Sequence, residues 1–306
     1  MSIEQLRRSA RGFIAATTRS TFECPTTEQV AEFYDRNGGA LAEIYRGQMH
    51  VGYWAGPEDD SGLDQAGARL TDIMISKLGA GPDDRILDLG CGSGAPAVQV
   101  ARATGAEVVG VSISTGDVEL ASATAEAEGM ADRVRFRHGD ALDLPFEPGS
   151  FDAVLALESF VHLPDRVWAL REIARVLRPG GRVVLTDYIR RGPEKMDEAE
   201  EYALAETLAD WRMVPMARAE HYPDFARQAG LAVDEITDIT EHTKYSFGQI
   251  YLATREYARK HGDLPPDLAK IFSKGTDEDW LESAEEPQYN GTVLVVARKA
   301  DDTATS

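Results

Sequence analysis

Three glycines in one short turn mark the first part of the chain that could bind a ligand. An apolar run, Arg85–Leu89, reads as a buried strand, and Gly90, Gly92 and Gly94 follow it directly. A helix is expected from Ala95 onward, because apolar residues recur there at helical spacing. Glycines let the backbone approach a ligand closely, and the first N–H groups of a helix point toward it. The sequence therefore predicts a binding site for a nucleotide-containing cofactor.

The sequence pattern allows two kinds of cofactor at this site. Gly90, Gly92 and Ala95 satisfy the dinucleotide pattern G-x-G-x-x-G/A. A dinucleotide site also uses an acid about 20 residues further on to bind the ribose. The next strand, Glu107–Val111, is followed instead by Ser112. This disfavours an NAD-dependent oxidoreductase.

Other reactive side chains follow the fourth and fifth expected strands. Glu158 and His162 come shortly after the fourth strand, and Asp187 ends the fifth. Ligands of open α/β sheets bind at the carboxyl ends of the strands, so these side chains are expected to face one cleft. The ordinary pKa of histidine, near 6.5, suits proton removal at neutral pH, and His162 is the predicted base. Asp187 would orient His162 or act as the base itself, and Glu158 is a third candidate.

Strands and helices alternate from residue 85 onward, which predicts an α/β fold with a doubly wound parallel sheet. The short apolar segments are typical of strands that are buried on both faces. After Asp187 the alternation stops, and a helical lid is expected at about 188–230. A second helical segment is expected through Asp279–Glu285. The seven expected strands are 85–89, 107–111, 133–138, 152–157, 182–187, 231–240 and 292–298.

The chain divides into an N-terminal helical cap segment over residues 1–70 and a cofactor-binding domain over 71–300. An amphipathic helix is expected within 1–20, where Ile3, Leu6, Ala10 and Phe13 share one face. That helix could pack on its own core or on a second copy of the chain, so a homo-oligomer stays open. Residues 301–306 are expected to form a disordered tail.

Composition restricts the classes of partner. The 306 residues carry 52 acidic and 32 basic side chains, a formal net charge of -20. Such a surface repels the phosphates of nucleic acid. The two cysteines, Cys24 and Cys91, fit a reducing cytoplasm. No apolar run reaches the ~18 residues of a membrane span, and no residues show reliable metal-ligand spacing.

The turn Asp88-Leu-Gly90-Cys-Gly92-Ser-Gly94 resembles motif I of the class I S-adenosylmethionine (SAM) methyltransferases. Two further stretches agree, Gly139-Asp140-Ala141 after the third expected strand and Leu177–Gly181 before the fifth. The resemblance implies SAM as the cofactor and a Rossmann-like, seven-stranded methyltransferase sheet. It also places an acid, here Asp140, against the adenine amine.

Further stretches resemble bacterial small-molecule methyltransferases of antibiotic and natural-product biosynthesis, including the type that methylates the sugar of rebeccamycin. They are Phe33–Asp35, His50–Trp54, Val111–Ser114, Ala156–Ser159, His162–Arg166 and Leu185–Asp187. The branch usually carries Gln where this chain has Asp117. Asp88 is expected to order the loop by accepting backbone N–H bonds, and Tyr34 and Tyr53 to close over the methionine end of SAM. The cofactor residues that this resemblance implies are Tyr34, Asp88, Gly90, Gly92, Gly94, Ser112, Asp117, Asp140, Ala141 and Glu158.

Three functions remain open at this point. The first is O-methylation of a small, largely apolar natural product, with His50, Tyr53 and Arg190 as candidate acceptor contacts. The second is C-methylation of an unsaturated acceptor such as a prenyl diphosphate, with Glu158 as base. Lid arginines would then meet the diphosphate, and a magnesium ion would be needed only there; these are Arg190, Arg191, Arg212 and Arg218. The third is a SAM-binding protein that does not methylate, either a cyclase or a structural protein.

Overall fold

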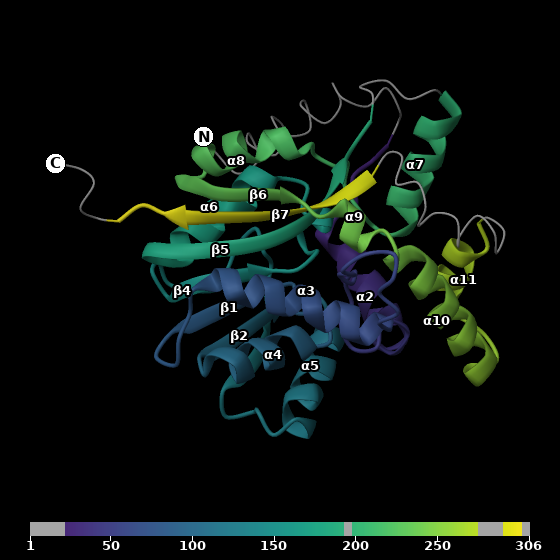
Figure 1. Cartoon of the computed structure of the whole chain (residues 1–306), viewed down its shortest axis with the longest axis horizontal. Coiled ribbons are helices and arrows are strands. Elements are labelled where there is room, and N and C mark those ends of the chain that lie inside the picture. The colour runs from purple at the N-terminus through teal and green to yellow at the C-terminus, as the bar shows by residue number, and fades with distance from the viewer. Residues whose placement is uncertain (1–21, 193–197, 275–289, 302–306) are drawn as a thin grey trace.

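The computed structural model describes residues 22–192, 198–274 and 290–301 of the chain (Figure 1). Three expectations lie outside these residues. They are the amphipathic helix within 1–20, the helical segment 279–285 and the tail from residue 302.

Seven strands form one sheet in the order β3-β2-β1-β4-β5-β7-β6, which confirms the predicted sheet. Neighbouring strands from β3 to β5 run parallel, whereas β7 runs antiparallel to both of its neighbours. The core strands are almost fully buried, as their apolar sequences predict. Their bounds are β1 Arg85–Leu89, β2 Glu107–Ser112, β3 Val134–His138, β4 Phe151–Ala156, β5 Leu177–Arg190, β6 Leu231–Asp238 and β7 Asn290–Lys299.

Helices cover both faces of the sheet. The apolar sides of α3 (Leu63–Leu78), α4 (Ala95–Thr104) and α5 (Thr115–Ala127) share one buried cluster with Ile86 and Val108. On the opposite face, α6 (Arg166–Val176) and α8 (Tyr222–Gln228) pack with the other side chains of the same strands. The predicted boundary at residue 70 therefore falls inside α3, a helix that packs on the sheet.

Four helices gather at one end of the molecule, at the right of Figure 1. They are α2 (Thr27–Ile44), α7 (Glu198–Asp210), α10 (Ser246–His261) and α11 (Pro266–Phe272). Apolar side chains of α2, α10 and α11 form a separate buried cluster. The start of α2 is set by a capping box, in which Thr26 Oγ accepts from Gln29 N–H and the Gln29 side chain accepts from Thr26 N–H. These helices form a cap beside the sheet.

The segment after the fifth strand is helical, but it begins later than expected. Residues Tyr188–Arg190 continue β5, because they pair with Asn290–Thr292 of β7. Then follow α7, the 3₁₀ turn η2 (Ala219–His221) and α8. Two other short helical elements are η1 (Phe160–His162) and α9 (Thr240–Thr243).

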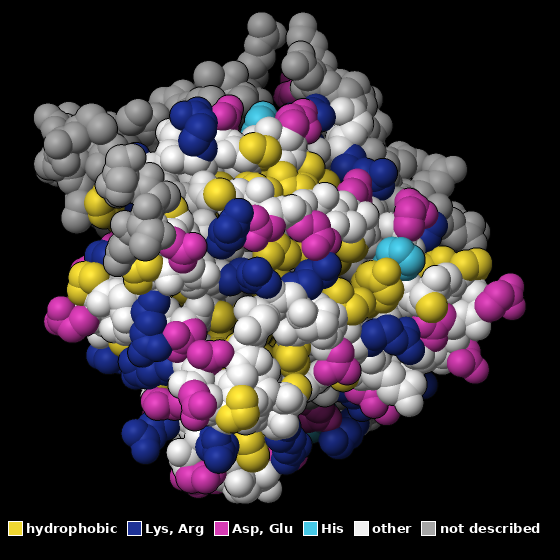
Figure 2. All heavy atoms as spheres, turned by 60° about the vertical axis from the view of Figure 1, so that its left-hand side comes forward, with side chains coloured by type: hydrophobic (Ala, Val, Ile, Leu, Met, Phe, Trp, Pro, Cys, Tyr) yellow, Lys and Arg dark blue, Asp and Glu magenta, His cyan; other side chains and the backbone are white. Residues whose placement is uncertain are grey.

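Acidic and basic side chains lie interspersed on the face shown in Figure 2. The described chain also carries exposed ion pairs, such as Arg298 with Asp234 at 2.8 Å and Arg102 with Glu128 at 2.6 Å. Within the described part of the chain, the search for a helix long and apolar enough to cross a bilayer finds none.

Candidate active site

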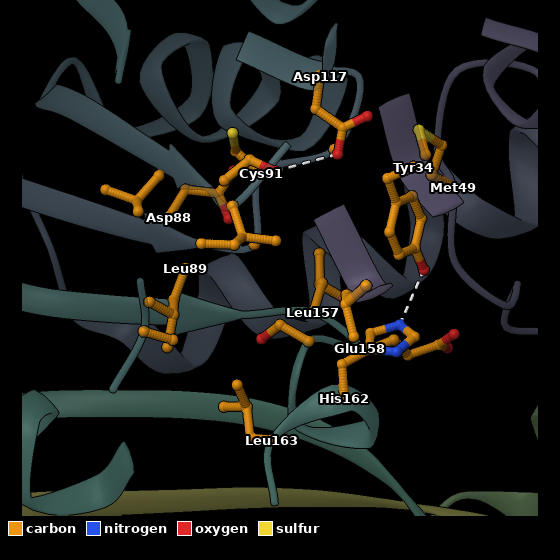
Figure 3. A pocket seen from close by; sticks show the side chains of 18 of the residues that line it. Tyr34, Met49, Asp88, Leu89, Cys91, Asp117, Leu157, Glu158, His162 and Leu163 are labelled. Atoms are coloured by element: carbon orange, nitrogen blue, oxygen red, sulfur yellow. Dashed lines mark hydrogen bonds between the residues drawn. The ribbon is translucent and has the colours of Figure 1, made fainter. Parts of the chain in front are cut away.

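A pocket lies where β1, β2 and β4 end (Figure 3), and its empty space, including the part open to solvent, is about 970 Å³. Residues from α2 and from the loop after it cover one side. The described lining residues are Thr27, Val30, Tyr34, Gln48, Met49, His50, Asp88, Leu89, Gly90, Cys91, Gly92, Pro96, Val111, Ser112, Ile113, Asp117, Gly139, Asp140, Ala141, Leu142, Leu157, Glu158, Ser159, His162, Leu163 and Pro164.

The glycine turn forms the floor of this pocket. Gly90 and Gly92 have positive φ angles of 80° and 47°, a conformation that glycine adopts without strain. The N–H groups of Gly90 and Cys91 both donate to the carbonyl of Val111, which ties the turn to the end of β2. Gly94 does not line the pocket, contrary to expectation. It precedes α4, and a Cβ there would lie 2.8 Å from Ala121, so its role is close packing.

Two carboxylates line the pocket with buried oxygens that have no hydrogen-bond partner among the described residues. They are Oδ2 of Asp88 and Oδ1 of Asp117. Burial raises the pKa of Asp88 to about 7 and that of Asp117 to about 6. The prediction that Asp88 accepts N–H bonds from the loop is wrong, because Gly90 and Cys91 donate to Val111 instead. Both carboxylates therefore remain available to a ligand.

This donor and acceptor set fits SAM. Buried carboxylate oxygens without partners suit the hydroxyl and ammonium groups of a nucleoside that carries an amino acid. Asp140 and Ala141 line the pocket at the end of β3, where the adenine contact is expected, and Oδ1 of Asp140 accepts from Leu142 N–H at 2.8 Å. Ser112 also lines the pocket, and its hydroxyl donates to Asp117 Oδ2 at 3.1 Å.

His162 lies at the edge of the pocket with both ring nitrogens in hydrogen bonds. Nδ1 is 2.8 Å from the carbonyl oxygen of Arg212, and Nε2 is 2.8 Å from the hydroxyl of Tyr34 (Figure 3). A carbonyl can only accept, so Nδ1 carries the proton and Nε2 is the acceptor in the neutral ring. Burial lowers the pKa of His162, which keeps the ring neutral at physiological pH. The lone pair of Nε2 therefore accepts from the Tyr34 hydroxyl, and both side chains line the pocket.

Asp187 does not reach the pocket, and the expectation that it orients His162 is wrong. Its side chain is fully buried, with Oδ2 accepting from Arg166 Nε at 2.7 Å and from the Tyr222 hydroxyl at 2.5 Å. Arg166, the first residue of α6, thus neutralises the Asp187 carboxylate. The backbone of Arg212 takes the place that was expected for Asp187.

Glu158 lines the pocket in a strained backbone conformation, with φ of 48°. Its Oε1 accepts from Val51 N–H at 3.0 Å, and its own N–H donates to Thr186 Oγ1 of β5 at 3.2 Å. Burial of the carboxylate raises its pKa to about 7. Glu158 therefore joins the loop after α2 to the end of β5 and changes its charge near neutral pH.

Of the three candidate acceptor contacts, His50 lines the pocket and the other two do not. His50 lines the pocket, but Nδ1 contacts the Val51 carbonyl at 2.8 Å and Nε2 lies 3.2 Å from both Gln48 Oε1 and Thr71 Oγ1. Its nitrogens are thus occupied by the protein, and burial lowers its pKa to about 4. Tyr53 stacks on His242 and lies outside the described pocket lining, as does Arg190, which continues β5.

Several functional contacts escaped the sequence analysis. The Arg212 carbonyl, which contacts His162, comes from the segment after α7, and no local pattern marks it. Asp35 does lie in a quoted motif; its carboxylate accepts from Ser114 Oγ at 2.6 Å and from Gly116 N–H at 3.0 Å, and so ties α2 to the start of α5. Among the described residues no group of three or more His, Cys, Asp or Glu side chains could hold a metal ion.

The sheet order, the glycine turn and the acid after β3 define a class I SAM-dependent methyltransferase. A family model described as a methyltransferase domain matches residues 87–185. The chain is 34% identical to the methyltransferase GfsG of Streptomyces halstedii, over 93% of this chain and 99% of that protein. It is also 34% identical to the 27-O-demethylrifamycin SV methyltransferase of Amycolatopsis mediterranei, over 90% of this chain and 99% of that one.

The chain therefore belongs to the SAM-dependent methyltransferases, in their small-molecule branch. A crystal structure of the [4+2]-cyclase SpnF superposes with a TM-score of 0.77 at 29% identity and covers 91% of this chain and 97% of that one. One relative of this fold thus bears the name of a cyclase rather than a methyltransferase.

Proposed function

We propose that the protein transfers the methyl group of SAM to a hydroxyl oxygen of a small, largely apolar natural product. The observation that carries this proposal is the state of His162. Its Nδ1 faces the Arg212 carbonyl, so Nε2 is unprotonated, and its one partner in the described chain is the hydroxyl of Tyr34, itself a pocket-lining residue. The name of the 27-O-demethylrifamycin SV methyltransferase supports an oxygen as the methyl acceptor.

The residues divide the work as follows. When bound, SAM supplies a methyl group already activated on a sulfonium. Asp88 and Asp117 would accept its polar hydrogens, and Asp140 its adenine amine. The acceptor hydroxyl would replace or share the Tyr34 hydroxyl at His162 Nε2, which would take its proton while the C–O bond forms, the S–CH₃ bond breaks and S-adenosylhomocysteine leaves. The low pKa of His162 keeps this nitrogen free to act.

The charge of the pocket supports a neutral acceptor over a diphosphate. The described lining residues include four acids, Asp88, Asp117, Asp140 and Glu158, and no Lys or Arg. A diphosphate would meet repulsion there without a matched cation. Of the lid arginines, Arg191 faces Asp238 at 3.4 Å and Arg218 donates to the Gly192 carbonyl. C-methylation of a prenyl diphosphate is therefore the weaker alternative.

A non-methylating reaction is the second candidate, because of the similarity to the cyclase SpnF. Methyl transfer and cyclisation differ in whether S-adenosylhomocysteine is formed. A methyltransferase releases S-adenosylhomocysteine in step with its methylated product, whereas a cyclase converts its substrate and leaves SAM intact.

The test compares wild type with His162→Gln, using SAM, 27-O-demethylrifamycin SV and a panel of small apolar alcohols. Removing the general base should lower kcat by about 10²–10⁴-fold. The affinity for S-adenosylhomocysteine should stay within about twofold, because His162 is placed on the acceptor side. His221→Gln is the matched control, since this histidine lies outside the described pocket lining. Full turnover by His162→Gln would contradict the proposal.

A further inference from the structure

The lid helix α7 ends in a tight reversal that carries an arginine where glycine is usual. Arg212 N–H donates to the Ala209 carbonyl, and Met213 N–H donates to the Leu208 carbonyl at 2.7 Å. This is the Schellman pattern, whose left-handed position is normally glycine. Arg212 occupies that position with φ of 55°. The chain therefore accepts backbone strain at this residue.

The strained backbone directs the Arg212 carbonyl at His162. Its oxygen lies 2.8 Å from Nδ1, and two residues later Val214 N–H donates to the Val161 carbonyl at 2.7 Å. The segment after α7 is thus hydrogen-bonded to the short helix that carries His162. A right-handed or extended residue at position 212 would turn this carbonyl elsewhere.

The arginine side chain has a separate task. Its Nη1 donates to the Ala209 carbonyl at 2.6 Å and to the Asp210 carbonyl at 3.3 Å, and the guanidinium lies 5.7 Å from the ring centre of Phe33. These contacts cap the end of α7 and pack it on α2. They do not involve His162, so the side chain and the backbone can be tested apart.

Ion pairs with a neighbouring helix and the residues after it also fix the end of α7. Asp210, its last residue, is buried and pairs with Lys270 of α11 at 2.7 Å and with Lys274 at 2.6 Å. The position of the Arg212 carbonyl therefore depends on the docking of α7 onto α11.

We propose that Arg212 is a positioning residue, whose left-handed backbone selects the tautomer of His162. With the carbonyl in place, the proton stays on Nδ1, and Nε2 stays an acceptor, here for the Tyr34 hydroxyl at the pocket. With the carbonyl turned away, the proton can occupy Nε2, and the ring then presents a donor to the acceptor hydroxyl. The expected change in kcat rests on the proposed role of His162 as the base. The expected change in the tautomer does not.

The experiment compares Arg212→Gly, Arg212→Asn and Arg212→Val in the full chain. Gly and Asn tolerate the left-handed conformation, whereas the β-branched Val opposes it. The readout is the ¹⁵N NMR spectrum of the histidine rings at pH 8, with the His162 signals identified by their loss in His162→Gln. Gly and Asn should keep the proton on Nδ1. Val should move a measurable fraction to Nε2 and lower kcat about tenfold or more, with unchanged affinity for S-adenosylhomocysteine.

The outcomes separate the two proposals. A Val variant that keeps Nδ1–H in full would overturn the positioning role, and so would a Gly variant that loses it, since the guanidinium would then be the cause. A changed tautomer with unchanged kcat would support the positioning role and overturn His162 as the base. If the Val variant does not fold, Arg212→Ala replaces it, with a smaller shift expected in the same direction.

Discussion

Replacing Asp117 by Asn should make the protein more stable and its cofactor affinity weaker. Asp117 is 4% exposed, its Oδ2 accepts from Ser112 Oγ, and its Oδ1 has no partner in the described chain. Burial of an ionised carboxylate is unfavourable, and it raises the pKa of Asp117 from 3.8 to about 6. An amide of the same shape removes the charge and keeps an acceptor for Ser112.

The gain in stability follows from the pKa difference. Because the pKa is higher in the folded chain than in the unfolded one, the folded chain binds more protons between these values, and stability falls as pH rises from about 4 to about 6. A difference of about 2 units corresponds to about 3 kcal/mol above pH 6. Asp117→Asn should therefore raise the free energy of unfolding in urea by up to about 3 kcal/mol at pH 8. Near pH 4 the effect should vanish.

The loss of affinity follows from the role proposed for this carboxylate. A hydrogen bond to a charged group contributes about 1.5–3 kcal/mol, so the Kd for S-adenosylhomocysteine should rise by about 10- to 150-fold at pH 8. In wild type the affinity should also fall as pH drops below about 6, where Asp117 binds a proton. The Asn variant should lack this dependence.

Calorimetric titration and urea unfolding measure the two quantities on the same samples. Asp132→Asn, at an exposed turn position, is the matched control and should change neither. A stabilised variant with unchanged Kd would refute the contact between Asp117 and the cofactor. An unchanged free energy of unfolding would refute the cost assigned to the buried charge.

Three further predictions concern the base, the buried ion pair and the sheet. Because burial lowers the pKa of His162, kcat should rise with pH through a midpoint below 6.5 and stay level above neutrality; a midpoint above 7 in a pH–rate profile would contradict this. Asp187→Asn leaves Arg166 buried without its charge partner and should cost about 3–5 kcal/mol in urea unfolding, with the affinity for S-adenosylhomocysteine preserved in folded protein. Gly110→Ala should lower the free energy of unfolding by about 1–3 kcal/mol, because the new methyl group would overlap a phenylalanine ring, whereas Gly39→Ala meets no neighbour and should not destabilise.

The sheet and the cofactor side of the site were predictable because their signals are local. The apolar run at Arg85–Leu89, the glycines after it and Asp140 after β3 each lie within one strand and its following turn. Strand ends were predicted to within a few residues, except for β5. Its extension to Arg190 depends on pairing with residues about a hundred positions later, which no local pattern reveals.

The acceptor side was less predictable because its contacts join distant segments. Asp187 was expected at the pocket from its place at a strand end, but α6 brings Arg166 against it and withdraws the carboxylate. His50 had the right chemistry, yet Thr71 and the Val51 carbonyl satisfy its ring. In each case a tertiary hydrogen bond decided whether a reactive side chain was available.

The choice between methyl transfer and another reaction depends on this less predictable side. The cyclase SpnF has the same fold as this chain, so the fold alone does not distinguish a methyltransferase from a cyclase. The transfer to oxygen that we propose requires an unprotonated nitrogen of His162 beside the acceptor hydroxyl. In this chain the protonation of His162 depends on the backbone carbonyl of Arg212. The position of that carbonyl depends on α7, whose last residue, Asp210, pairs with Lys270 of α11. On these proposals, a change that releases α7 should weaken methyl transfer more than the binding of S-adenosylhomocysteine, because α7 supplies no residue to the described pocket lining.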